Sequence, residues 1–275
     1  MTKLDRLGWA AGVAFEAQGL RIGIRATARE VQEPVLALLP PQARILRSRE
    51  VEQLFSLVVG GAGSRPGVRR MSLVYQETRL LFRTTSLAEA LRMLEVFMHL
   101  YVAERSRQRV FVHAGVVGWR GRAILLPGRS LSGKSTLVAA LVRAGATYYS
   151  DEFALVDRRG LVHPYPIPLA LRVDGADRPP VKRTVEMLSG TVGERPLPAG
   201  LVVLTRYEAG ARWRPRALSP GRALLEMLDH ALAARFAPER VMSALAPIVT
   251  GATILKGKRG DASTVAERIL YHLPG

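Results

Sequence analysis

The sequence has no cysteine, no long apolar run and few acidic residues. Without cysteine the chain can form neither a disulfide nor a thiolate metal site. No stretch approaches the 18 or so uncharged apolar residues of a transmembrane helix, so we expect no membrane span. The first residues, Met1 to Arg6, lead into no apolar signal segment with a small-residue cleavage site. Together these absences predict a cytoplasmic protein.

Acidic residues are outnumbered, with 23 Asp and Glu against 40 Lys and Arg and a net charge of +17. The basic residues are almost all arginine, and they are scattered along the chain. Because no zinc-finger or RNP-type motif accompanies them, we do not expect a nucleic-acid partner. The charge suits an acidic peptide or protein partner. A chain rich in Arg, Ala, Gly and Leu is also typical of a GC-rich genome.

One segment fits a phosphate-binding motif. Residues 128–135, Gly-Arg-Ser-Leu-Ser-Gly-Lys-Ser, match the P-loop pattern G-x-x-x-x-G-K-[ST]. The apolar run 122–126 before it predicts a buried strand, and residues 136–143 after it predict a helix that ends before Gly145. Backbone N–H groups at such a helix start bind anions. We expect nucleotide phosphates to contact Gly128, Ser130, Ser132, Gly133, Lys134, Ser135 and Thr136.

An acidic pair, Asp151 and Glu152, follows the short strand-like run 146–150. If this strand lies beside strand 122–126, Asp151 stands at its carboxyl end near the P-loop, where ligands of α/β sheets bind. A carboxylate there can hold Mg²⁺ or accept the proton of an attacking hydroxyl. The simpler interpretation is a solvated strand end. The adjacent P-loop favours a functional role.

These motifs together resemble the core of HPr serine kinase/phosphorylase, a family that is similar to ATP-dependent phosphoenolpyruvate carboxykinases around the P-loop. The resemblance rests on His113 with a short hairpin at 118–121, the P-loop, Gly145 and the run Ser150-Asp151-Glu152. It covers about residues 110–175. It implies an α/β fold, in which a P-loop core with a mixed sheet and flanking helices is joined to a smaller N-terminal α+β module.

The resemblance also implies roles for individual residues. Lys134 would contact the β- and γ-phosphates of ATP, and Ser135 would hold Mg²⁺. Asp151 would be the general base, with Glu152 helping to hold the metal. His113 would lie near the transferred phosphate. Independently, Arg172 follows the proline-rich stretch 163–168 and could return to bind phosphate, since arginine suits fork-like phosphate contacts.

The chain departs from the family pattern at three points. Asp151-Glu152 stands where the family has two aspartates, and Leu131 replaces an inner P-loop glycine. The glycine-rich segment that follows the core in HPr kinase/phosphorylases has no copy here. The resemblance therefore predicts a divergent kinase of this superfamily, with a peptide or protein hydroxyl as acceptor.

A chain of 275 residues with 48% hydrophobic content can form one or two domains. We expect an N-terminal α+β module over 1–105, for substrate or partner docking, and a catalytic domain over 106–275. In the module, strands are predicted at 20–25, 72–75 and 79–83, with helices at 27–39, interrupted by Pro34, and at 88–102. In the catalytic domain we expect a strand at 200–204 and helices at 223–235, 238–248 and 264–272.

Several functions fit these patterns. The first is an ATP- and Mg²⁺-dependent kinase acting on a serine-type hydroxyl of a peptide or protein. The alternatives are a nucleotide-binding regulator with little catalysis, a kinase of a small-molecule hydroxyl and, more weakly supported, a basic nucleic-acid-associated ATPase. No guanine-specificity motif is present, so ATP is the expected nucleotide. The sequence leaves the acceptor and the oligomeric state open.

Overall fold

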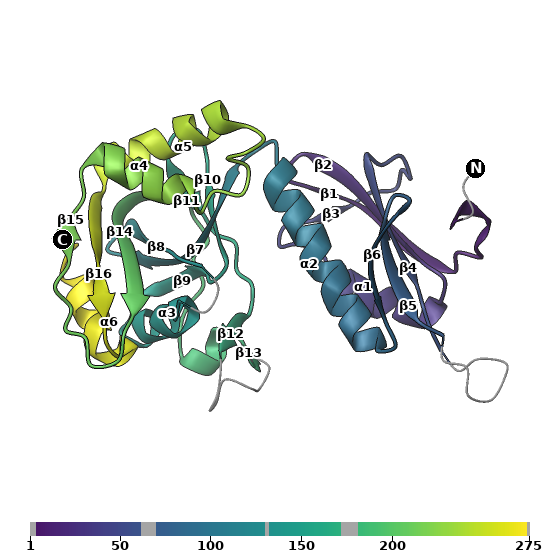
Figure 1. The fold of residues 1–275 in the computed structure, drawn as a ribbon, viewed down its shortest axis with the longest axis horizontal. Coiled ribbons are helices and arrows are strands. Elements are labelled where there is room, and N and C mark those ends of the chain that lie inside the picture. The colour runs from purple at the N-terminus through teal and green to yellow at the C-terminus, as the bar shows by residue number, and fades with distance from the viewer. Residues whose placement is uncertain (1–3, 62–69, 130–131, 172–180, 274–275) are drawn as a thin grey trace. The chain divides into compact units, whose positions relative to one another are not determined.

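The computed structural model describes residues 4–61, 70–129, 132–171 and 181–273. The chain divides into two compact units, residues 1–108 and 109–275. Each unit has its own main β-sheet, and both sheets mix parallel and antiparallel strands (Figure 1). The expected mixed α/β fold is therefore confirmed. None of the helices in these ranges has the length and apolarity that a membrane crossing requires.

The N-terminal unit is a six-stranded sheet in the order β3-β1-β2-β4-β5-β6. The helix α2 (Leu87–Arg105) packs on this sheet (Figure 1). Ser86 caps α2 by accepting a hydrogen bond from the Glu89 N–H at 3.3 Å. The strands are β1 (Ala11–Ala17), β2 (Leu20–Ala26), β3 (Arg44–Ile45), β4 (Gln53–Val58), β5 (Ser72–Gln76) and β6 (Arg79–Thr84).

The helix predicted at residues 27–39 is shorter than expected. A 3₁₀ turn at Arg29–Val31 leads into α1 (Gln32–Ala37). Pro34 does not interrupt α1, because it lies in the first turn, where its missing N–H would have had no helical acceptor. The strands predicted at 20–25, 72–75 and 79–83 are confirmed as β2, β5 and β6.

The second unit has an eight-stranded sheet whose main path is β11-β10-β7-β8-β14-β16-β15, with β9 pairing to β7. Its longer strands are β7 (Val110–Trp119), β8 (Arg122–Pro127), β14 (Leu197–Tyr207) and β16 (Thr253–Arg259). Its shorter strands are β9 (Thr147–Ser150), β10 (Phe153–Val156), β11 (Leu161–His163) and β15 (Arg216–Ala217). A separate hairpin is formed by β12 (Leu169–Leu171) and β13 (Val181–Arg183).

Helices cover both faces of this sheet (Figure 1). Along β8, Ile124 and Leu126 pack in one core with α3 (Lys134–Arg143) and α6 (Ala262–Leu270). Leu125, pointing the other way, packs in a second core with α4 (Pro220–Leu228) and α5 (Pro238–Gly251). Burial on both faces explains why residues 122–126 read as a continuous apolar run.

Most of the expected elements of this unit are present. The strand predicted at 200–204 is the centre of β14, and the helices predicted at 238–248 and 264–272 are α5 and α6. The helix predicted at 223–235 is wrong in extent. The observed helix, α4, starts earlier and ends at Leu228. His230 to Phe236 form turns closed by local backbone hydrogen bonds. The apolar spacing continues through these turns because Ala231 and Ala233 still pack in the core.

Candidate active site at the P-loop

The phosphate-binding motif has the local structure that its sequence predicts. Strand β8 ends at Pro127, and α3 begins at Lys134. Gly128 and Ser132 lie close together, since a Cβ on Gly128 would lie 2.7 Å from Ser132 Oγ. The Gly128 N–H donates to the His113 carbonyl at 3.3 Å, which ties the loop to β7. The start of α3 therefore faces the edge of the sheet where β8 ends.

Gly133 and Arg259 form a close contact at the start of α3. Gly133 has a left-handed φ of 81°, which glycine adopts without strain. Its carbonyl accepts a hydrogen bond from Arg259 Nη2 at 2.7 Å. A Cβ at position 133 would lie 2.5 Å from the same nitrogen, so a larger residue would be strained at this φ and would also displace the guanidinium. Arg259 is 2% exposed, which places a buried guanidinium directly behind the loop.

Lys134 lies where the electrostatics favour a phosphate ligand. Its ammonium donates to the Gly128 carbonyl at 3.3 Å. Burial lowers the pKa of Lys134 to about 8, although the charges of Asp151 and Glu152 act in the opposite direction. The ammonium therefore lacks the full compensation that a buried charge needs, and bound phosphates would supply it.

The acidic pair lies next to the loop, but the strand pairing that places it there differs from the one expected. Strand β9 does not lie beside β8, because the β7–β8 hairpin inserts β7 between them. Both β8 and β9 run antiparallel to β7, so their carboxyl ends lie at the same edge. Ala114 of β7 pairs with Pro127 at the end of β8, and Val116 pairs with Ser150 at the end of β9. The bend at 151–152 thus lies next to the P-loop.

Gly115 makes this juxtaposition possible. It sits on β7 between Ala114 and Val116, and a Cβ there would lie 2.5 Å from Val138 Cγ2 of α3. The same Cβ would lie 3.3 Å from Lys134 Cγ and 3.8 Å from the Asp151 carbonyl. The missing side chain lets α3 and the acidic bend approach β7 closely.

Asp151 is buried, at 5% exposure, and is not a solvated strand end. Burial raises the pKa of its carboxyl, while hydrogen bonding from Ser135, the Lys134 charge and the Ala170 N–H act to lower it. The Ala170 N–H reaches Oδ2 at 3.4 Å, and Oδ1 has no hydrogen-bond partner among the described residues. Burying a carboxylate oxygen without a hydrogen-bond partner costs free energy unless a bound ligand supplies the missing interaction.

This unpartnered oxygen fits a hard cation. Mg²⁺ prefers carboxylate and hydroxyl oxygens, and it usually keeps water and substrate phosphates as its other ligands. Asp151 and Ser135 offer the protein oxygens of such a site. The side chain of Glu152 is exposed, and its carbonyl accepts from the Ala114 N–H at 3.1 Å. Within the described ranges no three His, Asp or Glu side chains gather into a protein-only metal site.

His113 is held beside the loop through its backbone, with its N–H donating to the His230 carbonyl at 2.7 Å. Burial, and then the nearby charges of Lys134 and His230, lower the pKa of His113 to about 4. The imidazole is therefore neutral at physiological pH. A neutral ring can orient a phosphate or water through a hydrogen bond but brings no charge to it.

A basic cleft of about 990 Å³ opens beside the loop, at the carboxyl ends of the parallel strands β8, β14 and β16. Lys256 pairs with Glu226 in its wall, and Lys258 pairs with Glu208 at 2.6 Å. The basic residues that line the cleft are Arg129, Arg206, Arg214, Arg216, Lys256 and Lys258. The four arginines among them have no ion pair with any described residue.

Such a cleft concentrates polyanions next to the P-loop. Sequence reasoning missed this half of the site, together with Arg259 and His230. The clusters at 212–216 and 256–259 were visible in the sequence, but nothing local showed that β16 runs beside β14. Two expected ligands, Ser130 and Arg172, lie outside the described residues. Thr136 is exposed at the first turn of α3.

Comparison with known proteins finds similarity among solved structures alone. No model of a protein family matches this sequence, and no curated protein matches it. Among solved structures, the chain is similar to the Hpr(Ser) kinase/phosphatase from Coxiella burnetii, with 12% identity and a TM-score of 0.33. The match covers 58% of this chain and 93% of that one. Because identity and score are this low, the function must be inferred from the residues of the site.

Proposed function

We propose that this protein is an ATP- and Mg²⁺-dependent kinase that transfers the γ-phosphate to a serine-type hydroxyl of a peptide or protein. The observation that carries this proposal is the buried Asp151 carboxylate, with one unpartnered oxygen, next to Ser135 and Lys134 of a P-loop. A P-loop alone supports nucleotide binding. A buried carboxylate beside its lysine adds a group that can accept a proton where phosphate is transferred.

In this proposal each residue has a distinct task. Lys134 and the N–H groups at the start of α3 bind the β- and γ-phosphates, and the basic cleft holds the rest of the anion. Bound Mg²⁺, held by Ser135 and Asp151, would neutralise charge on the phosphates. Neutral His113 orients the acceptor or the transferred group through a hydrogen bond.

The chemical step is an in-line displacement. The acceptor oxygen forms a bond to the γ-phosphorus, while the bond from that phosphorus to the bridging oxygen of ADP breaks. The hydroxyl proton passes to Asp151, and ADP leaves with the bonding electron pair. Burial raises the pKa of Asp151, which makes the carboxylate a better proton acceptor than a solvated one.

The direct test is transfer of labelled γ-phosphate from ATP and Mg²⁺ to proteins of a cell extract, with Lys134→Ala as the control. We expect label on a discrete acceptor with wild type and none with the variant. ATP that is bound but never consumed with any acceptor would instead support a nucleotide-binding regulator. Label on a small molecule alone would identify a small-molecule kinase.

A further inference from the structure

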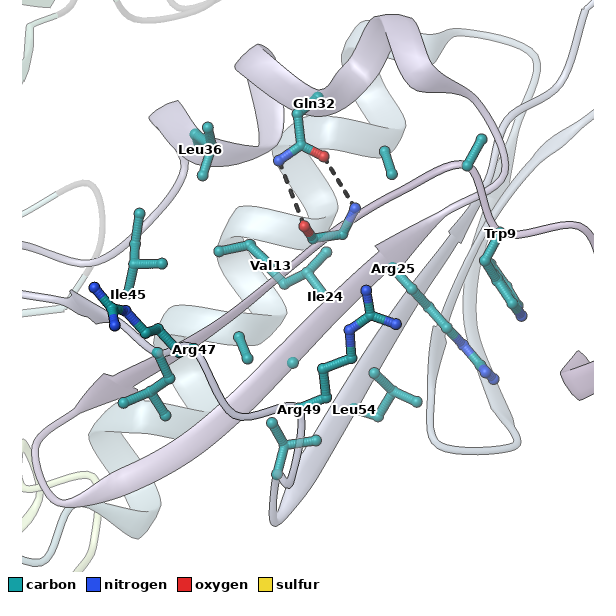
Figure 2. A pocket seen from close by; sticks show the side chains of 17 residues that line it. Trp9, Val13, Ile24, Arg25, Gln32, Leu36, Ile45, Arg47, Arg49 and Leu54 are labelled. Carbon is teal, nitrogen blue, oxygen red and sulfur yellow. Dashed lines mark hydrogen bonds between the residues drawn. The ribbon is translucent and has the colours of Figure 1, made fainter.

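A groove of about 870 Å³ lies in the N-terminal unit, on the sheet near α1. It follows five consecutive residues, Ala10 to Ala14, and is lined on the other side by Gly23 to Arg25 of β2 (Figure 2). Strand residues advance about 3.3 Å each, so the groove is roughly 13 Å long at least. This length suits an extended chain better than a compact ligand.

The floor of the groove is made of small residues. Ala14 lies opposite Gly23 in the β1–β2 register, and Gly12 lies opposite Arg25. A Cβ on Gly23 would lie 3.0 Å from Leu54 Cδ1, so glycine here lets the apolar Leu54 pack close to the strand. The result is a shallow channel with room above the backbone of β1 and apolar walls.

The outer edge of β1 has few backbone partners along this channel. β3 pairs with β1 at Phe15 and Glu16, and the Leu46 N–H donates to the Ala14 carbonyl at 2.8 Å. Further along, the side-chain amide of Gln32 accepts from the Gly12 N–H at 3.0 Å and donates to the Gly12 carbonyl at 3.5 Å (Figure 2). These are the two hydrogen bonds that a neighbouring peptide group would make. Because the backbone groups of Gly12 and the Ala14 carbonyl are already bonded, a ligand in this channel would be held by the side chains that line it.

The groove is basic. Arg47 and Arg49 line it, are exposed, and have no ion pair with any described residue. Arg25 is already paired with Asp5 at 3.2 Å. No described residue lining the groove is acidic. The nearby acids are engaged elsewhere, since Glu16 pairs with Arg44 at 3.0 Å and Glu50 lies 4.0 Å from Arg21.

The arrangement of these charges distinguishes among anionic ligands. Figure 2 shows the guanidinium groups of Arg25, Arg47 and Arg49 spread along the groove instead of converging on one point, as a single phosphate would need. Nucleic acid would stack bases on exposed aromatic faces. Trp9, the aromatic residue of the groove, has Arg25 over its ring at 4.1 Å, so that face is already covered.

We propose that this groove binds an extended peptide segment that alternates acidic and apolar side chains. The carboxylates would pair with Arg47 and Arg49, and the apolar side chains would contact residues such as Leu54 and Ile45, which is 60% exposed. The further step, that this segment belongs to the phosphate acceptor, rests on the proposed kinase function. It would give the kinase a recognition site separate from its chemistry.

Binding is tested with the full chain and without ATP, so that the result does not depend on kinase activity. The probe is a fluorescein-labelled synthetic peptide of about ten alternating glutamate and valine residues, followed by fluorescence anisotropy. The test variant is Arg47→Glu with Arg49→Glu. The matched control is Arg79→Glu with Arg83→Glu, which makes the same charge change on exposed residues of β6.

We expect the groove variant to weaken binding at least tenfold and the control variant less than threefold. A peptide with lysine in place of glutamate should not bind. Equal losses in both variants, no binding by wild type, or preferential binding of oligo-dT that the groove variant abolishes would overturn the proposal. Once an acceptor is known, the groove variant should raise its KM and leave kcat unchanged. A fall in kcat alone would contradict recognition at this groove.

Discussion

Burial and the nearby acidic charges shift the pKa of Lys134 in opposite directions, and their net effect can be measured. Because burial lowers the pKa of Lys134 to about 8, the free protein loses this charge as the pH rises through that value. A bound triphosphate would retain the proton. ATP affinity should therefore be full below about pH 8 and should fall above it by up to about tenfold per pH unit, the limit for one linked proton.

Lys134→Arg is the matched variant for this prediction, because arginine stays protonated throughout the range. Titration of ATP binding from about pH 7.5 to 9.5 at fixed Mg²⁺ should show the decline in wild type only. His113 does not interfere, since its pKa of about 4 leaves it neutral across the whole range. The same decline in both proteins would show that another group titrates.

At the scale of elements, β16 supports the phosphate loop through Arg259. Its guanidinium is buried, bonds the Gly133 and Gly260 carbonyls at 2.7 and 3.0 Å, and leaves Nε without a partner among the described residues. Its pKa is lowered, chiefly by burial. The charge of Asp261 acts on this guanidinium, but no carboxylate forms an ion pair with it among the described residues, so its field is available to the bound phosphates.

Arg259→Met should weaken ATP binding about tenfold, because a charged hydrogen bond is worth about 1.5 kcal/mol or more. Arg259→Lys should retain part of the affinity, since it keeps the charge. Arg212→Met is the control: it removes the same charge from an exposed residue outside the cleft. Melting temperatures and ATP titrations of all three separate lost folding from lost binding. Unchanged affinity in a folded Arg259→Met protein would contradict the supporting role.

Local patterns in the sequence predicted where helices and strands form better than they predicted which strands lie side by side. The apolar run 122–126, the loop glycines and the helix before Gly145 all formed as expected, because each depends on residues close in sequence. The position of β9 did not, because pairing with β7 depends on a hairpin that competes for the edge of β8. Arg259 was unpredictable for the same reason, since it meets Gly133 from 126 residues away.

At the scale of the whole molecule, arginines without an ion pair to any described residue line two cavities that can bind anions. One is the cleft beside the P-loop, and the other is the groove along β1. The acidic partner suggested by the charge total stays a prediction, and the total does not show which surface would bind one. Arg47, Arg49 and Arg206 are unremarkable in a sequence where arginine is common, and only the fold separates them from the paired arginines.

The central claim is that Asp151 performs chemistry beside a P-loop that binds ATP. The measurement that tests it most directly is ATP binding and γ-phosphate transfer in the same preparation of Asp151→Asn. We predict that its dissociation constant for ATP, measured without Mg²⁺ because Asp151 is also a proposed metal ligand, stays within about threefold of wild type. Transfer with Mg²⁺ should fall about 100-fold or more, as expected for a lost general base. Transfer by the variant at near the wild-type rate would contradict the claim.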